Sequence, residues 1–273
     1  MALGEALTNM SGVVIKGLNN VQVSANWMAA SGENSDDFAL RSGVEALSKI
    51  AVDLKVSIPV GKDSLSMRTK WSENNSDYEV SSPLSGVITA MAPVDDVTES
   101  VTPELNTSDD TSILLIKLNN KNRLAGSIFS EITETKYQHT PDIDDIEVFE
   151  KLFSGIQNLL KSKKILAMHD ISDGGLITTL LEMCFTKKVG MRLNLDDSSG
   201  VNEFLFSEEI GFAIQIKKNN LDEVTNTLTN ENIYVKNIAE LIDGEKFSIF
   251  KNDSEIFSKL SLIHISEPTR PYL

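Results

Sequence analysis

Apolar residues recur at helical spacing in two stretches of the chain, three or four positions apart. Such stripes are typical of amphipathic helices that bury one face. The first stripe predicts a helix that begins near Asp36 or Asp37 and ends before Pro59, and the second predicts a helix after an acidic loop at residues 141–145. The stripes consist of Leu40, Val44, Leu47, Ala51 and Leu54, and of Ile146, Phe149, Phe153, Ile156 and Leu160.

Short apolar or alternating runs predict β-strands around these helices. Shorter helices are expected at residues 1–10 and 174–185. Residues 95–111 are polar and have no periodic face, so we expect them to join two domains. This succession predicts an α/β or α+β architecture. The predicted strands are residues 21–26, 66–71, 79–94, 113–118, 164–168, 210–216, 234–238 and 247–250.

The composition narrows the classes of partner and cofactor. The 273 residues include 25 Lys and Arg against 40 Asp and Glu, a formal net charge of −15, which repels nucleic acids and anionic membranes. The first residues lack the features of a signal peptide, and no apolar run is long enough to cross a bilayer, so we expect a cytoplasmic protein. A single cysteine, Cys184, and 3 histidines exclude an internal disulfide and the usual zinc sites. A site in which oxygen ligands bind a hard cation remains possible. Cys184 has apolar neighbours in the sequence, so we expect it in the core.

The segment MHDISDGGL at residues 168–176 is the strongest candidate site, because it lies between a predicted strand and a predicted helix. Ser172 or Asp173 could cap the helix, and free amides at the glycine pair would attract phosphate. Asp170 could hold a divalent cation beside it. The alternative is a plain capped turn in which both aspartates face water. His169 could orient a phosphate or bond a backbone carbonyl.

Two other segments carry groups that could bind small ions. Glu5 and Asn9 stand four apart on one helix face, so their oxygens could reach one Mg²⁺ ion, although solvated faces carry such pairs often. Residues 59–67 include Gly61-Lys62 but fail the P-loop pattern, because Val56 and Asp63 stand where Gly and Ser or Thr are needed. The segment is therefore interpreted as a glycine turn that carries a cation and hydroxyl groups. It could bind an anionic group, or it could be an ordinary solvated turn.

Residues 261–273 do not continue the pattern of the preceding strands and turns. This stretch resembles a translated adapter sequence. We predict a non-native tail and leave it out of the functional interpretation.

Five blocks of the sequence together resemble, in order and spacing, a known enzyme family. It is the synthetase region of large phosphoribosylformylglycinamidine synthase, the formylglycinamide ribonucleotide amidotransferase of purine biosynthesis. The resemblance runs from Met1 to about Gln215. The blocks are residues 5–9 (EALTN), 24–28 (SANWM), 58–67, 82–85 (SPLS) and 169–176.

The resemblance implies a fold of class α/β plus α+β, shared with aminoimidazole ribonucleotide synthetase. Residues 1–105 would form the N-terminal half, with helices and a mostly antiparallel sheet, truncated at its start. Residues 111–260 would form the C-terminal α+β half. The full-length family contains this pair twice, and the chain resembles the second copy, so we expect a fragment that needs the remainder of the full-length chain.

The resemblance also implies the chemistry. Family members use ATP, Mg²⁺ and glutamine-derived ammonia to convert formylglycinamide ribonucleotide to its amidine. The second copy is similar to one that holds ADP or ATP with Mg²⁺ without turnover. By matching position, Glu5, Asn9 and Asp170 would be magnesium ligands and Ser172 a nucleotide contact. No catalytic residue is implied.

A third group of residues, Gly61, Lys62 and Ser64, would contact the ribonucleotide substrate by the same resemblance. The chain also departs from the family pattern. It lacks the glutaminase domain that supplies ammonia and the first synthetase copy, and a further aspartate ligand of the family falls before Met1.

We therefore expect a purine-biosynthetic ligase fragment with an auxiliary nucleotide and Mg²⁺ site and part of the substrate cleft, inactive alone. One alternative is another ATP-dependent enzyme of the same fold superfamily, such as a small-molecule kinase or selenophosphate synthetase, although these lack the block at residues 24–27. A second alternative is a non-catalytic nucleotide-binding scaffold. Nucleotide binding without turnover would favour it.

Overall fold

The computed structural model describes residues 1–32, 34–108, 110–195 and 200–260. Its contacts divide the chain into two compact units. Of the described residues, the larger unit holds Met1, residues 11–14 and those from 96 to 260, and the smaller unit holds residues 2–10 and those from 15 to 95. No helix in these described ranges is long and apolar enough to cross a membrane. The predicted non-native tail, 261–273, lies outside the described residues.

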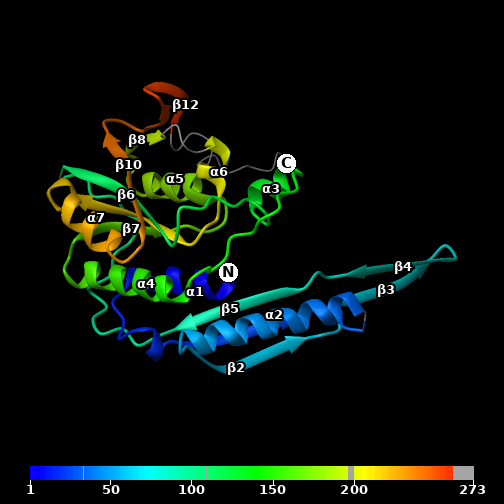
Figure 1. Ribbon diagram of the computed structural model, residues 1–273. Helices are drawn as coiled ribbons and strands as arrows, with labels where there is room; N and C mark the ends of the chain where they lie inside the picture. The colour runs from blue at the N-terminus through cyan, green and yellow to red at the C-terminus, as the bar shows by residue number, and fades with distance from the viewer. Residues whose placement is uncertain (33, 109, 196–199, 261–273) are drawn as a thin grey trace, which may run out of the picture. The chain divides into compact units, whose positions relative to one another are not determined.

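The larger unit is built on a seven-stranded sheet with the strand order β12-β11-β8-β10-β6-β9-β7. Neighbouring strands are antiparallel except β8 and β11. Every residue of β6 is buried, because helices lie on both sides of the central strands (Figure 1). The strands are β6 Thr111–Lys117, β7 Ile165–Asp170, β8 Gly190–Leu195, β9 Gly211–Lys217, β10 Tyr234–Ile242, β11 Lys246–Lys251 and β12 Ser254–Leu260.

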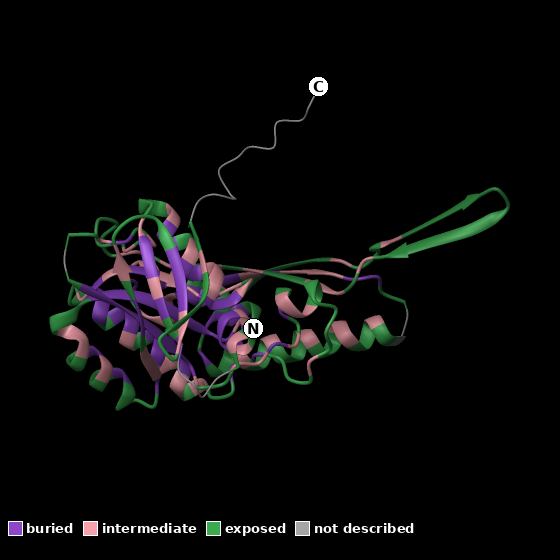
Figure 2. Ribbon diagram, turned by 90° about the horizontal axis from the view of Figure 1, so that it is seen from above, coloured by how far each residue is buried: buried purple, intermediate pink, exposed green. Residues whose placement is uncertain are grey.

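The described residues of the larger unit form five helices, and the buried residues gather on the strands of the sheet and on the facing sides of the helices (Figure 2). Helix α4 begins after Asp145, whose carboxylate accepts a hydrogen bond from the Val148 amide, as the acidic loop before the apolar stripe predicted. Cys184 on α5 is fully buried in the core, which confirms its predicted place. The helices are α3 Ile128–Ile132, α4 Ile146–Lys161, α5 Gly175–Lys187, α6 Val201–Phe206 and α7 Leu221–Thr229.

The smaller unit contains a three-stranded sheet of order β2-β1-β5 and a separate hairpin of β3 and β4. Strand β1 is parallel to β2 and antiparallel to β5. Trp27 of β1 packs so closely against α2 and β5 that a Cβ added at Gly43 or Gly86 would lie 3.1 or 3.2 Å from its ring. The elements are α1 Ala2–Asn9, β1 Gln22–Met28, α2 Asn34–Asp53, β2 Ser57–Ser64, β3 Arg68–Glu73, β4 Ser76–Ser81 and β5 Ser85–Met91.

The structure corrects the predicted start of α2, which begins at Asn34 rather than at Asp36 or Asp37. Asp37 lies inside the first turn, and its carboxylate accepts hydrogen bonds from the Ser31 hydroxyl at 2.7 Å and the Gly32 amide at 3.1 Å. These bonds lower the pKa of Asp37. The aspartate therefore stabilises the helix start by reaching back to the preceding loop.

Residues 96–105 belong to the larger unit by their contacts, whereas the sequence assigned them to the first half. The amide of Val101 donates to the carbonyl of Gly12, and the amide of Met168 donates to the carbonyl of Thr102. Leu105 is fully buried in the larger core. A polar segment without periodicity is thus anchored by backbone hydrogen bonds, which the side-chain pattern does not predict.

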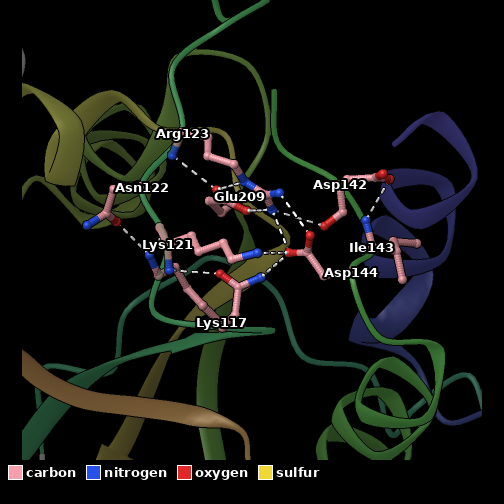
Figure 3. Close-up of polar contacts among 9 residues, drawn as sticks. Lys117, Lys121, Asn122, Arg123, Asp142, Ile143, Asp144 and Glu209 are labelled. Atoms are coloured by element: carbon pink, nitrogen blue, oxygen red, sulfur yellow. Dashed lines mark hydrogen bonds and ion pairs between the residues drawn. The ribbon is translucent and has the colours of Figure 1, made fainter. Parts of the chain in front are cut away.

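A buried ion-pair network connects the ends of β6 and β9 (Figure 3). The Arg123 guanidinium donates to both carboxylate oxygens of Glu209 at 2.7 Å and to both of Asp144 at 2.9 and 3.0 Å. Only 13% of the Arg123 side chain and 2% of the Glu209 side chain are exposed. Hydrogen bonding to Glu209 raises the pKa of Arg123, so the guanidinium stays charged.

Lys117 lies in the same network with 3% of its surface exposed. Its ammonium donates to the Lys121 carbonyl at 2.5 Å and to Asn122 Oδ1 at 2.6 Å. Burial lowers the pKa of Lys117 to about 8, against the opposing attraction of Glu209. The charged form is thus disfavoured in the folded chain relative to the unfolded one.

The Lys117→Met variant is expected to have a different pH dependence of stability from the wild type. Below pH 8 Lys117 is protonated in both the folded and the unfolded chain, and burial of its charge costs about 3 kcal/mol of folding stability. This cost becomes smaller as the pH rises toward 10.5, because the unfolded chain then binds more protons than the folded chain. Between pH 8 and 10, the stability of the wild type relative to the variant should therefore rise by about 2 kcal/mol. Urea unfolding by circular dichroism measures this difference. The exposed Lys49→Met is the control, and parallel pH profiles would contradict the expectation.

Candidate functional site

Asp170 is the last residue of β7, opposite Phe212 of β9, and the following turn leads into α5. The sheet therefore places the carboxylate at a strand end beside a helix start, as the sequence predicted. Its Oδ2 atom is buried and has no hydrogen-bond partner among the described residues. A buried acceptor without a partner is costly, which indicates an oxygen kept for a ligand.

The His169 ring lies between two carboxylates. Its Nδ1 is 3.2 Å from Asp170 Oδ1, and its Nε2 is 2.8 Å from Glu182 Oε2 on α5. The hydrogen bond to Asp170 chiefly raises the pKa of His169, with burial opposing and Glu182 adding to the effect. Neither predicted role of His169, a phosphate contact or a bond to a backbone carbonyl, includes this bridge.

The glycine pair after Ser172 and Asp173 is conformationally required. Gly174 and Gly175 have φ of 85° and 72°. A Cβ at Gly175 would also lie 2.7 Å from the Phe206 backbone, because α6 packs directly against the turn. The turn therefore needs glycine both for its positive φ angles and for the close approach of the α6 backbone to Gly175.

Two predictions for this turn are wrong: the helix cap at Ser172 or Asp173, and the free amides at the glycine pair. The N-cap of α5 is Gly174, without a side-chain cap bond, so neither Ser172 nor Asp173 caps the helix. The Gly174 amide is not free, since it donates to Glu208 Oε1 at 2.9 Å, and the same oxygen accepts from the Ile128 amide at 2.9 Å. The chain's own carboxylate thus holds the position that the sequence assigned to phosphate.

Glu5 and Asn9 are exposed and lie on one face of α1, while Leu3 and Leu7 on the opposite face are buried. Both residues line a cavity of about 420 Å³ together with residues 86–90 of β5. The spacing of four therefore does place two oxygen-bearing side chains at one hollow, as predicted. Within the smaller unit this is where a hard cation could be held.

The predicted magnesium ligands are divided between the units, with Glu5 and Asn9 in the smaller and Asp170 in the larger. Each group fits a hard cation by itself, the first by its carboxylate and amide oxygens and Asp170 by its unpaired buried oxygen. No cluster of three or more His, Cys, Asp or Glu in the described ranges could hold a metal ion. An ion at Asp170 would thus need phosphate or amide oxygens as well.

The predicted glycine turn at Gly61, Lys62 and Ser64 is wrong, because these residues lie in strand β2. They pair in parallel with Ala25, Asn26 and Met28 of β1, respectively. The Lys62 ammonium donates to the Ser64 hydroxyl on the same face of the strand. Gly61 has ordinary room for a Cβ, so no turn requires a glycine there. The cation and the hydroxyl are nevertheless adjacent.

Two family models match the chain. Residues 1–93 match the model described as FGAR-AT PurM_N-like domain, and residues 110–252, more than half of the chain, match the AIR synthase related protein, C-terminal domain. The chain belongs to the AIR synthase related family. The predicted AIR synthase-like fold of class α/β plus α+β is thereby confirmed for this family member.

Solved structures with the same fold are distant in sequence. PurL of Thermotoga maritima complexed with ATP is 12% identical with a TM-score of 0.67, over 94% of this chain and 40% of that chain. The same PurL complexed with FGAR is 11% identical with a TM-score of 0.65, over 95% and 42%. HypE of E. coli is 13% identical with a TM-score of 0.65, over 94% and 79%. The AIR synthase related chain thus spans about two fifths of the PurL chains.

Proposed function

We propose that the chain is the second AIR synthase-like copy of a phosphoribosylformylglycinamidine synthase and that it binds ADP or ATP together with Mg²⁺. The buried Oδ2 of Asp170 carries this proposal, because a carboxylate oxygen at a strand end that lacks a partner among the described residues suits a hard cation. The match of residues 1–93 to the FGAR-AT model supports it. So do the T. maritima PurL structures complexed with ATP, ADP and FGAR.

In this proposal Glu5 and Asn9 of the smaller unit and Asp170 of the larger unit are magnesium ligands, and Mg²⁺ would offset the charge of the nucleotide phosphates when bound. Ser172, half-buried beside Asp170, contacts the nucleotide. The ammonia that converts formylglycinamide ribonucleotide to its amidine would come from a glutaminase domain outside this chain.

Gly61, Lys62 and Ser64 are proposed to contact the ribonucleotide. Lys62 is exposed on β2, where its ammonium can attract the phosphate of the substrate while Ser64 fixes its position. This places an anion-binding cation on a strand rather than in a turn.

Calorimetric titration of the purified chain with ADP tests the proposal. Binding is expected with Mg²⁺ and not with excess chelator, because the cation links the acidic side chains to the phosphates. Equal affinity in both conditions would contradict it. A phosphate-release assay with ATP and formylglycinamide ribonucleotide should show no sustained turnover by this chain alone, since the copy that it resembles holds its nucleotide without turnover.

A second candidate is another ATP-dependent enzyme of this fold, which the HypE match favours because the chain covers 79% of that protein but about 40% of PurL. Sustained ATP hydrolysis by the chain alone would support this alternative. Magnesium-dependent binding without turnover would support the fragment, or a nucleotide-binding scaffold.

A further inference from the structure

The strongest unassigned arrangement in the larger unit is the carboxylate–imidazole–carboxylate series of Glu182, His169 and Asp170. The ring is 19% exposed, Asp170 11% and Glu182 50%. Two elements contribute, since His169 and Asp170 end β7 and Glu182 lies in the middle of α5. The Thr179 hydroxyl also donates to the Asp170 carbonyl at 3.1 Å, which ties α5 to the same strand end.

The two oxygens of Asp170 have different surroundings. The Nδ1 of His169 is 3.2 Å from Oδ1, whereas Oδ2 is buried and has no hydrogen-bond partner in the described part of the chain. A carboxylate that is bonded on one side can rotate less freely about its terminal torsion. The series therefore fixes the direction in which the unpaired Oδ2 is presented.

We propose that Glu182 and His169 are positioning residues that hold the Asp170 carboxylate so that Oδ2 meets a divalent cation. This inference rests on the proposed function, because the cation is the one bound with nucleotide. His169 does not need to touch the metal, since both of its ring nitrogens face carboxylates. Substitution of a residue that hydrogen-bonds a metal ligand commonly lowers metal affinity by about 10- to 100-fold.

A purely structural role predicts a different result. The Glu182 carboxylate is half-exposed, and exposed ion pairs contribute only about 0–1 kcal/mol to stability. Loss of the bridge should therefore change folding stability little. A large change in cation affinity at nearly constant stability distinguishes positioning from packing.

Two amide substitutions separate the two contacts of the ring. In His169→Asn the side-chain NH₂ stands near the place of Nδ1 and can still donate to Asp170. In His169→Gln the NH₂ stands near the place of Nε2 and can reach Glu182 instead. The exposed His139→Gln is the matched control.

The experiment uses the whole chain with Mn²⁺ as the probe in the presence of ADP, and electron paramagnetic resonance measures free and bound Mn²⁺. We expect His169→Gln to weaken Mn²⁺ binding by about 10- to 100-fold and His169→Asn to bind within about threefold of the wild type, with melting temperatures that differ little. Glu182→Gln should weaken binding by no more than about threefold in the wild type, like His169→Asn, and not further in His169→Asn, because Asn cannot reach Glu182.

Three results would overturn the inference. Wild-type affinity in His169→Gln would show that the bridge does not position Asp170. Equal weakening in His169→Asn and His169→Gln, in step with lower melting temperatures, would show a structural role. Failure of the wild type to bind Mn²⁺ with ADP would overturn the proposed function and this inference together, so the two failures are distinguishable.

Discussion

Glu209→Gln is expected to lower the free energy of unfolding of the larger unit by about 3 kcal/mol. The glutamine keeps the shape of the side chain but leaves the Arg123 guanidinium without its buried counter-charge, and removal of one partner of a buried ion pair costs about 3–5 kcal/mol. We expect the lower end of this range because Arg123 keeps its bonds to Asp144.

The measurement requires a probe in the larger unit. Both tryptophans, Trp27 and Trp71, belong to the smaller unit, so urea unfolding is followed by far-ultraviolet circular dichroism, with hydrogen exchange at β6 and β9. The control is Glu147→Gln on α4, which removes an exposed pair with Lys151 and should cost less than about 1 kcal/mol. If both variants lost the same small amount, the buried pair would contribute no more to stability than a surface pair.

This network shows what the sequence could not predict. Arg123 and Glu209 are 86 positions apart, and each stands in a polar stretch without periodicity. Only the antiparallel pairing of β6 with β9 brings the residues after the first strand beside those before the second. The apolar runs predicted both strands correctly, but not their pairing or the charges held at their ends.

Strand β2 was missed for a local reason. Pro59, Gly61 and Asp63 are poor strand formers, and the Gly-Lys pair suggested a turn. The strand tolerates Pro59 because β2 is at the edge of its sheet and Pro59 lies within the register shift between Ser57 and Val60, where the pairing with β1 is irregular. Tertiary pairing with β1 therefore outweighs the local propensity.

The candidate site was predicted in part. Strand, turn and helix around Asp170 follow from the apolar pattern and the glycine pair. Glu182 and Glu208 were not predicted, because an acidic residue on a helix or after it has no pattern of its own. Both became visible only as partners of groups in the turn.

Asp170→Asn is expected to weaken Mg²⁺-dependent ADP binding by about 10- to 100-fold, whereas Asp173→Asn should change it little. The two residues are three positions apart, but of the two only Asp170 has a buried oxygen that lacks a partner among the residues that the structure describes. Asp173 is exposed and makes no side-chain cap on α5. An amide at position 170 keeps an oxygen but loses the full charge that a hard cation prefers.

Calorimetric titration of both variants with ADP at saturating Mg²⁺ measures this difference, with melting temperatures as the check on folding. The amide oxygen of Asp170→Asn can still accept a hydrogen bond from His169, so ADP affinity should fall by more than the stability does. A loss of ADP affinity that exceeds the loss of stability distinguishes a carboxylate that binds a ligand from one that stabilises the fold. Equal ADP affinities of the two variants at equal stability would show that the unpaired Oδ2 of Asp170 does not face the cation.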